Sequence, residues 1–233
     1  MQILPGVYLI NGFPYGLHQN GYLVQTPDAA IVIDSGDMEK PSFSVVESAC
    51  QRWGFSPSRV SHLLLTHAHF DHASRAARFR ALGASIVASQ DTAEAIAAGD
   101  ERCIGYAMSS TFEPCQADII LRDGETIDLG GLAVRGLAAP GHTNGLIIYE
   151  IVVNDERIWF VGDLVEVGPE CATLTLGWPG SPDHDPETYL ETLRKLTRMP
   201  CDTLLPGHGP PALGLGKQLI DKAYTTAMVA RSS

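Results

Sequence analysis

The decisive stretch of the sequence is Thr66-His67-Ala68-His69-Phe70-Asp71-His72, which places three imidazoles and one carboxylate within six positions. It follows an apolar run at 62–65 that is typical of a short strand, and it precedes a segment with helical spacing. In extended backbone, residues i and i+2 point to the same side, so His67 and His69 can grip one ion. A turn after them would bring Asp71 and His72 round toward a second ion. The alternative is a solvated, histidine-rich helix start, which predicts no further ligands downstream.

Further ligands do follow, each after an apolar run and beside a glycine. They are His142 in Pro140-Gly141-His142, Asp163 in Val161-Gly162-Asp163 and His208 in Pro206-Gly207-His208. Glycine lets the backbone bend and approach closely at such points. Together with the first cluster they supply five histidines and two aspartates. That number fits two zinc ions, each with three or four ligands and a place for water, so we predict two Zn²⁺ per chain. Iron or manganese is the alternative metal.

The chain of 233 residues is 45% hydrophobic and 18% charged, as in an ordinary globular protein. Strand-like runs alternate with helical stretches in both halves, and no linker separates them. We therefore expect a single domain over 1–233, with sheets covered by helices. The expected strands are 3–10, 21–25, 30–33, 62–65, 86–88, 119–121, 126–129, 132–137, 146–153, 157–161 and 203–205. The expected helices are 44–53, 73–82, 92–98, one that begins after the N-cap Asp185, and 217–230.

The charge balance argues against nucleic-acid and membrane partners. Sixteen basic and 27 acidic residues leave a net charge of −11, which repels phosphate backbones and anionic lipids. No apolar run approaches the length of about 18 residues that a membrane span needs. The sequence begins without a basic, apolar leader, so we expect a cytoplasmic protein. The five cysteines are scattered, which predicts neither a disulfide framework nor a CxxC zinc site.

The order of these motifs resembles the metallo-β-lactamase superfamily. The resemblance extends from Ile33-Asp34-Ser35-Gly36 to Pro206-Gly207-His208-Gly209. It implies an α/β fold, the four-layer αβ/βα sandwich of that superfamily. By position, it implies that the first metal is bound by His67, His69 and His142, the second by Asp71, His72 and His208, and that Asp163 bridges them. Asp34 would orient a ligand imidazole; a simple turn carboxylate is the alternative.

The charges of such a centre favour hydrolysis. Two Zn²⁺ with Asp71, Asp163 and a bridging hydroxide carry a net charge of about +1, which would stabilise a developing oxyanion. Zinc lowers the pKa of bound water to about 7, so hydroxide is available at neutral pH. We therefore predict a metal-dependent hydrolase whose hydroxide attacks a carbonyl carbon. Asp71 is the candidate catalytic residue, because it lies beside the nucleophile and can accept a proton.

Within the superfamily, Asp163 favours a small ester, lactone or thioester as substrate, because true β-lactamases generally carry Cys or Ser at that place. Hydrolysis of a β-lactam stays an alternative. Glyoxalase II enzymes append basic helices for glutathione, whereas only Lys217, Lys222 and Arg231 follow His208 here. A second alternative is a mononuclear-iron oxidoreductase resembling persulfide dioxygenases, with His67, His142 and Asp163 as ligands. A metal-binding sensor without turnover is a third.

Two segments are candidates for the walls of a pocket that binds a small-molecule acyl substrate. One is the loop at 11–20, and the other is the stretch at 165–181. Their apolar groups, and one within the motif, would favour an acyl chain or ring: Phe13, Tyr15, Phe70 and Trp178. Tyr15 or His18 is a candidate donor to the oxyanion. The alternative for each of these residues is an ordinary loop anchor or core position. The oligomeric state is left open.

Overall fold

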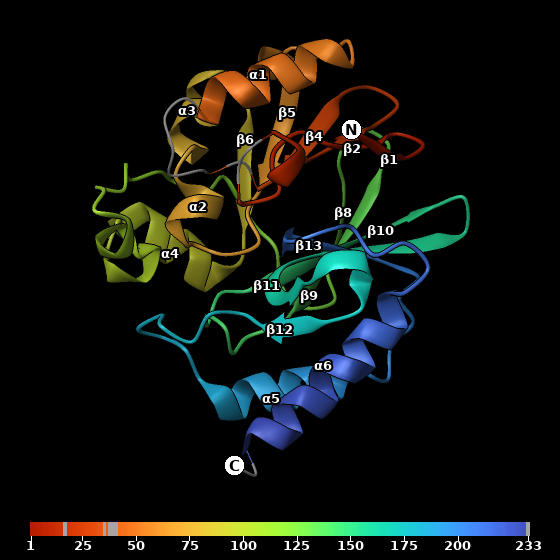
Figure 1. Cartoon of the computed structure of the whole chain (residues 1–233). Coiled ribbons are helices and arrows are strands. Elements are labelled where there is room, and N and C mark those ends of the chain that lie inside the picture. The colour runs from red at the N-terminus through yellow and green to blue at the C-terminus, as the bar shows by residue number, and fades with distance from the viewer. Residues whose placement is uncertain (16–17, 35, 37–41, 232–233) are drawn as a thin grey trace.

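The computed structural model describes residues 1–15, 18–34, 36 and 42–231, and only the backbone at 13, 42, 43 and 108. Two β-sheets are stacked face to face, and helices cover the outer side of each sheet (Figure 1). This arrangement confirms the predicted four-layer αβ/βα sandwich. That residues 1–233 form a single domain stays a prediction.

The first sheet has seven strands in chain order. They are β1 (Gln2–Leu4), β2 (Val7–Leu9), β3 (Tyr22–Gln25), β4 (Ala30–Ile33), β5 (Val60–Leu64), β6 (Ser85–Ala88) and β7 (Ile119–Ile120). The strands from β1 to β4 pair antiparallel, and those from β4 to β7 pair parallel. Parallel strands need crossover connections. These contain the helices α1 (Ser42–Arg52), α2 (Phe70–Ala73), α3 (Ala76–Ala81) and α4 (Gln90–Ala98).

The second sheet has the order β12-β11-β10-β9-β8, and β13 pairs with β11 in parallel. Its strands are β8 (Thr126–Asp128), β9 (Ala133–Ala138), β10 (Ile147–Val153), β11 (Glu156–Val167), β12 (Leu174–Leu176) and β13 (Thr203–His208). Two helices, α5 (Pro186–Leu196) and α6 (Gly216–Arg231), lie on its outer side (Figure 1). Short 3-10 helices are η1 (Phe13–Tyr15), η2 (Pro57–Arg59), η3 (Glu101–Cys103), η4 (Gly105–Met108) and η5 (Pro169–Cys171).

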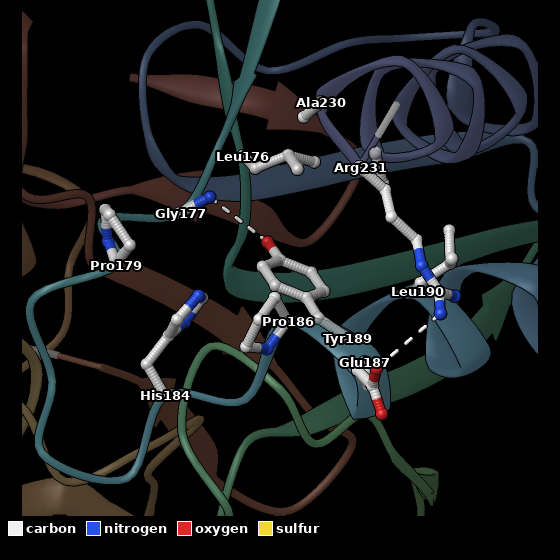
Figure 2. A pocket seen from close by; sticks show the side chains of 11 residues that line it. Leu176, Gly177, Pro179, His184, Pro186, Glu187, Tyr189, Leu190, Ala230 and Arg231 are labelled. Atoms are coloured by element: carbon white, nitrogen blue, oxygen red, sulfur yellow. Dashed lines mark hydrogen bonds and ion pairs between the residues drawn. The ribbon is translucent and has the colours of Figure 1, made fainter. Parts of the chain in front are cut away.

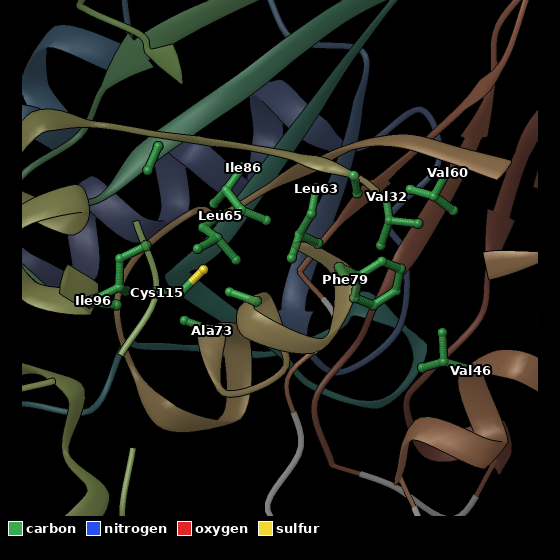
Figure 3. Packing of buried hydrophobic residues seen from close by; sticks show 14 of the residues in the cluster. Val32, Val46, Val60, Leu63, Leu65, Ala73, Phe79, Ile86, Ile96 and Cys115 are labelled. Carbon is green, nitrogen blue, oxygen red and sulfur yellow. The ribbon is translucent and has the colours of Figure 1, made fainter. Parts of the chain in front are cut away.

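The alternation of side chains along the strands divides the core into three layers. In β4 and β5, Val32 and Leu63 face the helices of the first sheet, where they pack near Phe79 of α3 (Figure 3). Their neighbours Ile31 and Leu64 point the other way, into the layer between the two sheets. A third layer lies between the second sheet and the helices α5 and α6. Strand β4 is buried on both faces, which is why its sequence Ala30–Ile33 is apolar throughout.

Two expected elements are each divided in the structure. The strand expected at 3–10 is two strands, β1 and β2, because Pro5 and Gly6 form a turn in which Gly6 has φ +76°. The helix expected at 73–82 is interrupted after Ala73, and Arg75 has the non-helical angles φ −99° and ψ 5°. The helix α2 therefore starts earlier than expected and includes Asp71 and His72. Strand β12 was not predicted.

Strand β11 continues beyond the expected end at 161, as far as Val167. Its register against β13 shifts on either side of Gly162, which has φ +50°. Asp163 therefore does not follow the end of a strand, as predicted, but lies at an irregularity inside one. A bulge of this kind re-aims a side chain without ending the strand.

Two local predictions are confirmed. Asp185 caps α5, since its carboxylate accepts hydrogen bonds from the backbone N–H groups of Glu187 and Thr188. The hairpin between β10 and β11 turns at Asn154 and Asp155, whose φ angles of 51° and 63° suit a tight turn with left-handed residues. Across the described ranges, no helix combines the length and the apolar character that crossing a membrane requires.

The layered core predicts that substitutions of two neighbouring residues in β10 differ strongly in how much they destabilise the protein. Ile151 is 1% exposed between the sheets, whereas Val152 is 50% exposed. Replacing Ile151 by alanine should lower the free energy of unfolding by about 2–5 kcal/mol, because it leaves a cavity. The matched change Val152→Ala should cost less than about 1 kcal/mol. Urea denaturation of both variants measures the difference, and equal losses would contradict the layer assignment.

Candidate metal centre

All seven predicted residues come together where loops leave the two sheets. Their ligand atoms form two groups, and within each group they lie within 4.8 Å of one another. The first group is His67, His69, His142 and Asp163, and the second is Asp71, His72 and His208. His67 and His69 lie in the loop after β5, and His142 lies in the loop after β9. Asp71 and His72 lie in α2, while Asp163 and His208 lie in β11 and β13.

The carboxylate of Asp163 lies between the two groups. Its Oδ1 is 3.1 Å from Nε2 of His72, and its Oδ2 is 3.5 Å from Nε2 of His208. The same Oδ2 is 3.7 Å from Nε2 of His142 and 3.9 Å from Nε2 of His67. One side chain therefore faces ring nitrogens of both groups.

Several atoms at this point are buried without a hydrogen bond. Among the described residues, Nε2 of His67 has no hydrogen-bond partner, and Nε2 of His72 and Oδ1 of Asp163 face each other at 3.1 Å without the geometry of a hydrogen bond. Buried polar atoms are normally paired, because an unpaired one costs free energy. Imidazole nitrogens and carboxylate oxygens are ligands for zinc and other divalent transition metals. The donor set therefore fits metal ions. The roles of these residues as ligands stay a prediction.

The histidines of the first group favour their neutral form. Burial lowers the pKa of His67 well below its ordinary value, with further lowering by His72 and His69. Burial also lowers the pKa of His69 to about 4 and that of His142 to about 3, against the opposing effect of Asp163. Neutral imidazoles are the form that binds metal, so these three residues are ready at neutral pH.

The second group behaves in the opposite way. Burial by itself would lower the pKa of His72, but Asp163, Asp71 and Asp34 outweigh it and raise that pKa well above its ordinary value. Burial is likewise outweighed at His208, where Asp163 and Asp71 raise the pKa to about 12. Without metal, both imidazoles are therefore protonated on both ring nitrogens at neutral pH. Their positive charge balances the negative charge of the nearby carboxylates.

Metal binding should therefore displace protons. We expect on the order of two protons to be released per chain at pH 7, because His72 and His208 must lose theirs to become ligands. The apparent metal affinity should rise with pH between 6 and 9 for the same reason. Calorimetric titrations of chelator-treated protein with Zn²⁺, in buffers of different ionisation enthalpy, count the protons. Binding without proton release at pH 7 would contradict the protonated state of both histidines.

Asp34 contacts the ring nitrogen of His72 that is remote from Asp163. Its Oδ2 accepts a hydrogen bond from Nδ1 of His72 at 2.9 Å. Its two oxygens also accept from the backbone N–H of Thr66 at 2.8 Å and from the Thr66 hydroxyl at 2.6 Å. Asp34 has φ +45°, a left-handed angle that a non-glycine residue rarely adopts. The hydrogen bond to an imidazole that the predicted role of Asp34 requires is present, and the role itself stays a prediction.

Weakening the hydrogen bond between Asp34 and His72 should weaken metal binding by the second group. In Asp34→Asn one acceptor oxygen becomes a donor, so one of its three hydrogen bonds must be lost. We expect zinc affinity to fall by about 10–100-fold, measured by competition with a chromophoric chelator. Glu191→Gln serves as the control, because this exposed carboxylate pairs only with Arg194 among the described residues. Equal affinities in the two variants would show that Asp34 has no part in orienting His72.

The glycines beside the ligands are required by close packing. A Cβ atom on Gly207 would lie 2.4 Å from Oδ1 of Asp163 and 2.6 Å from Cε1 of His72. A Cβ atom on Gly162 would lie 2.4 Å from the hydroxyl oxygen of Thr66. Any larger residue would push the centre apart. This confirms the close backbone approach that the sequence predicted at both motifs.

Tyr189 of α5 supports the strand that carries Asp163. Its hydroxyl donates to the carbonyl of Leu164. The same hydroxyl accepts from the backbone N–H of Gly177 at 3.1 Å (Figure 2). The ring also borders a cavity of about 500 Å³ between the loop after β12 and the helices α5 and α6. A tyrosine at a core position of a helix gives no sequence signal for such a role, because its partners are distant in the chain.

Of the residues predicted to line the substrate site, some lie near the candidate metal centre and others do not. Trp178 lies near the centre, since its ring is 6.3 Å from that of His69, and it is 43% exposed. Phe70 is instead buried against Phe112, so the alternative of a core position applies. The Tyr15 hydroxyl accepts a hydrogen bond from the N-terminal amine and donates its own proton to the carbonyl of Leu9. These contacts do not support the oxyanion role of Tyr15, which stays a prediction. The Phe13 side chain lies outside the described residues, as do Gly16, Leu17 and Ser35.

His18 lies beside the second group. Its backbone carbonyl accepts a hydrogen bond from Nδ1 of His208 at 3.2 Å. Both residues line a cavity of about 570 Å³, whose other described lining residues are Met1, Leu9, Pro14, Asn20, Glu166, Val167, Pro169, Glu170, Gly209, Pro210 and Pro211. This cavity therefore borders the candidate metal centre at His208.

Residues 14–208 match the family model described as the metallo-beta-lactamase superfamily. The chain belongs to this superfamily. The subclass B3 metallo-β-lactamase BJP-1 of Bradyrhizobium japonicum has a similar fold, with a TM-score of 0.79, 19% identity, and coverage of 100% of this chain and 91% of that chain. At this identity the likeness concerns the fold alone.

Curated relatives carry names of hydrolases. The thioesterase pkgB of Emericella nidulans is 26% identical over 220 residues, which cover 91% of this chain and 51% of that protein. A hydroxyacylglutathione hydrolase of Maricaulis maris is 28% identical over 197 residues, which cover 84% of this chain and 63% of that protein. The chain spans about half the length of the first curated relatives it matches.

Proposed function

We propose that this protein is a hydrolase that uses two zinc ions to cleave a small acyl substrate, with a thioester as the first choice and an ester or lactone next. The observation that carries the proposal is the position of Asp163. Its two carboxylate oxygens face both groups of ligand atoms, at 3.1–3.9 Å from four imidazole nitrogens. A carboxylate placed in this way suits a pair of cations that share one ligand.

The ligands divide between two ions in this proposal. His67, His69 and His142 would hold the first metal, and Asp71, His72 and His208 the second, with Asp163 shared. When bound, the metals would lower the pKa of water to about 7 and polarise the acyl oxygen. The protein contributes a fixed arrangement, because Asp34 and the neighbouring glycines hold the ligands in place before substrate arrives.

Asp71 would move the proton. Its side chain is 15% exposed, whereas those of His67, His72 and His142 are 0% exposed, so among these ligands it is the one that borders solvent. It is 3.2 Å from Nε2 of His208, whose side chain is 20% exposed on the same side. An accessible carboxylate beside the attacking water can accept its proton and pass it to the leaving group.

The choice of a thioester rests on the relatives and on the cavity. Both curated relatives described above are named as hydrolases, one of them a thioesterase. The cavity at His208 is lined mainly by proline and aliphatic residues, which suit an acyl chain. Its described lining also includes Glu166 and Glu170 and has no lysine or arginine. That charge is unfavourable to the carboxylates of glutathione, so we propose an uncharged thioester.

The alternatives are weighed by the same geometry. A mononuclear-iron oxidoreductase needs only one group of ligands, whereas Asp71, His72 and His208 supply a second group here. For hydrolysis of a β-lactam, the similarity to solved β-lactamases supports the fold and not the substrate. The dinuclear hydrolase therefore remains the best-supported function.

The test is a substrate panel on zinc-loaded protein. We expect close to two zinc ions per chain by elemental analysis, and hydrolysis of uncharged thioesters in preference to lactones, phosphodiesters and β-lactams. Asp163→Ala should lower kcat/KM by at least about 100-fold and reduce zinc content. Asp221→Ala is the control, since this exposed carboxylate pairs with Lys217 on α6. One iron per chain with oxygen uptake, or full activity in Asp163→Ala, would refute the proposal.

A further inference from the structure

Within the first group, His69 directs a different ring nitrogen inward than His67 and His142 do. His67 and His142 direct Nε2 toward Asp163, at 3.9 and 3.7 Å. In His69 it is Nδ1 that lies inside the group, 3.1 Å from Nε2 of His142. Its Nε2 points outward to the hydroxyl of Ser181 at 3.1 Å. His69 can bind a metal through Nδ1 only if its ring proton stays on Nε2.

A hydrogen-bond chain behind His69 determines where that proton lies. The Ser181 hydroxyl donates to Oδ1 of Asp183, because a carboxylate can only accept. A hydroxyl has one proton, so the Ser181 oxygen can then only accept from His69. Nε2 of His69 must therefore be the donor, and Nδ1 keeps its lone pair for the group. Ser181 is 7% exposed, so water has little access to replace either contact.

Asp183 also connects the loops that carry two of the ligands. Its Oδ2 accepts a hydrogen bond from the backbone N–H of Asn144 at 2.9 Å, two residues after His142. Asp183, Ala68 and Thr143 line the same small cavity, so the loops after β5, β9 and β12 meet there. The carboxylate thus acts on His69 through Ser181 and on His142 through the backbone.

We propose that Ser181 and Asp183 are positioning residues that fix the Nε2–H tautomer of His69 and so present Nδ1 to the metal. The inference rests on the proposed function in one respect, that metal is the ligand of this group. It assigns a role to the loop between β12 and α5, of which the sequence marked only the part up to Ser181 as a candidate substrate wall.

Two variants test this series of hydrogen bonds: Asp183→Asn reverses its direction, and Ser181→Ala removes its middle member. In Asp183→Asn the amide oxygen can still accept from Asn144, while the NH₂ group donates to Ser181. The Ser181 proton then turns to Nε2 of His69 and moves the ring proton to Nδ1, where metal must bind. We expect zinc affinity to fall by about 10–100-fold in Asp183→Asn and in Ser181→Ala, measured by competition with a chelator.

The matched control is Asp185→Asn, two residues further along the same loop. The side chain of Asp185 accepts hydrogen bonds from the first turn of α5, namely from Glu187 and Thr188. Asparagine is an equally good N-cap, so zinc affinity should match that of the unaltered protein. Unchanged affinity in both Ser181→Ala and Asp183→Asn would overturn the proposal.

A second readout does not depend on activity or on the folding of a variant. Imidazole ¹H–¹⁵N correlation spectra of the unaltered, chelator-treated protein should show the His69 proton on Nε2. A proton on Nδ1 in that spectrum would overturn the proposal. Failure of the hydrolase function would appear in the substrate panel and would leave this spectrum and the zinc titrations unchanged, so the two failures are distinguishable.

Discussion

The structure depends on one buried negative charge. Asp163 is 5% exposed and lies between two groups of imidazoles. An isolated buried carboxylate would cost many kcal/mol, so positive charge must stand beside it. Without metal, His72 and His208 supply that charge as bound protons, which is why the pKa of each is raised and that of Asp163 is well below its ordinary value. Metal ions would take over the same role.

The two groups of ligands therefore differ before any metal arrives. Burial keeps the histidines of the first group neutral, and nearby carboxylates keep the histidines of the second group protonated. The difference follows from the fold, because Asp34 at the end of β4 and Asp71 in α2 lie on the side of His72. Parallel pairing of β11 with β13 brings His208 to the same side.

Three of the seven candidate ligands are supported by contacts that reach across the layers. Asp34 holds His72, Tyr189 of α5 holds the strand beside Asp163, and Ser181 holds His69. These supports come from the first sheet, from an outer helix and from the loop before it. The centre therefore lies where both halves of the molecule meet, so that small changes in the packing of the sheets would alter the distances between ligands.

The sequence by itself determined the seven candidate ligands, the alternation of strands and helices, and the cap at Asp185. These are local features: ligand spacing, apolar runs and a glycine or N-cap beside each turn. The tertiary structure decided that Asp163 sits at an irregularity inside β11, that Phe70 is core, and that Tyr15 is occupied elsewhere. It also decided the contacts of Tyr189 and Ser181. The hydrogen bond from His69 to Ser181 joins positions 112 residues apart, and no local pattern encodes a contact that only the stacking of two sheets creates.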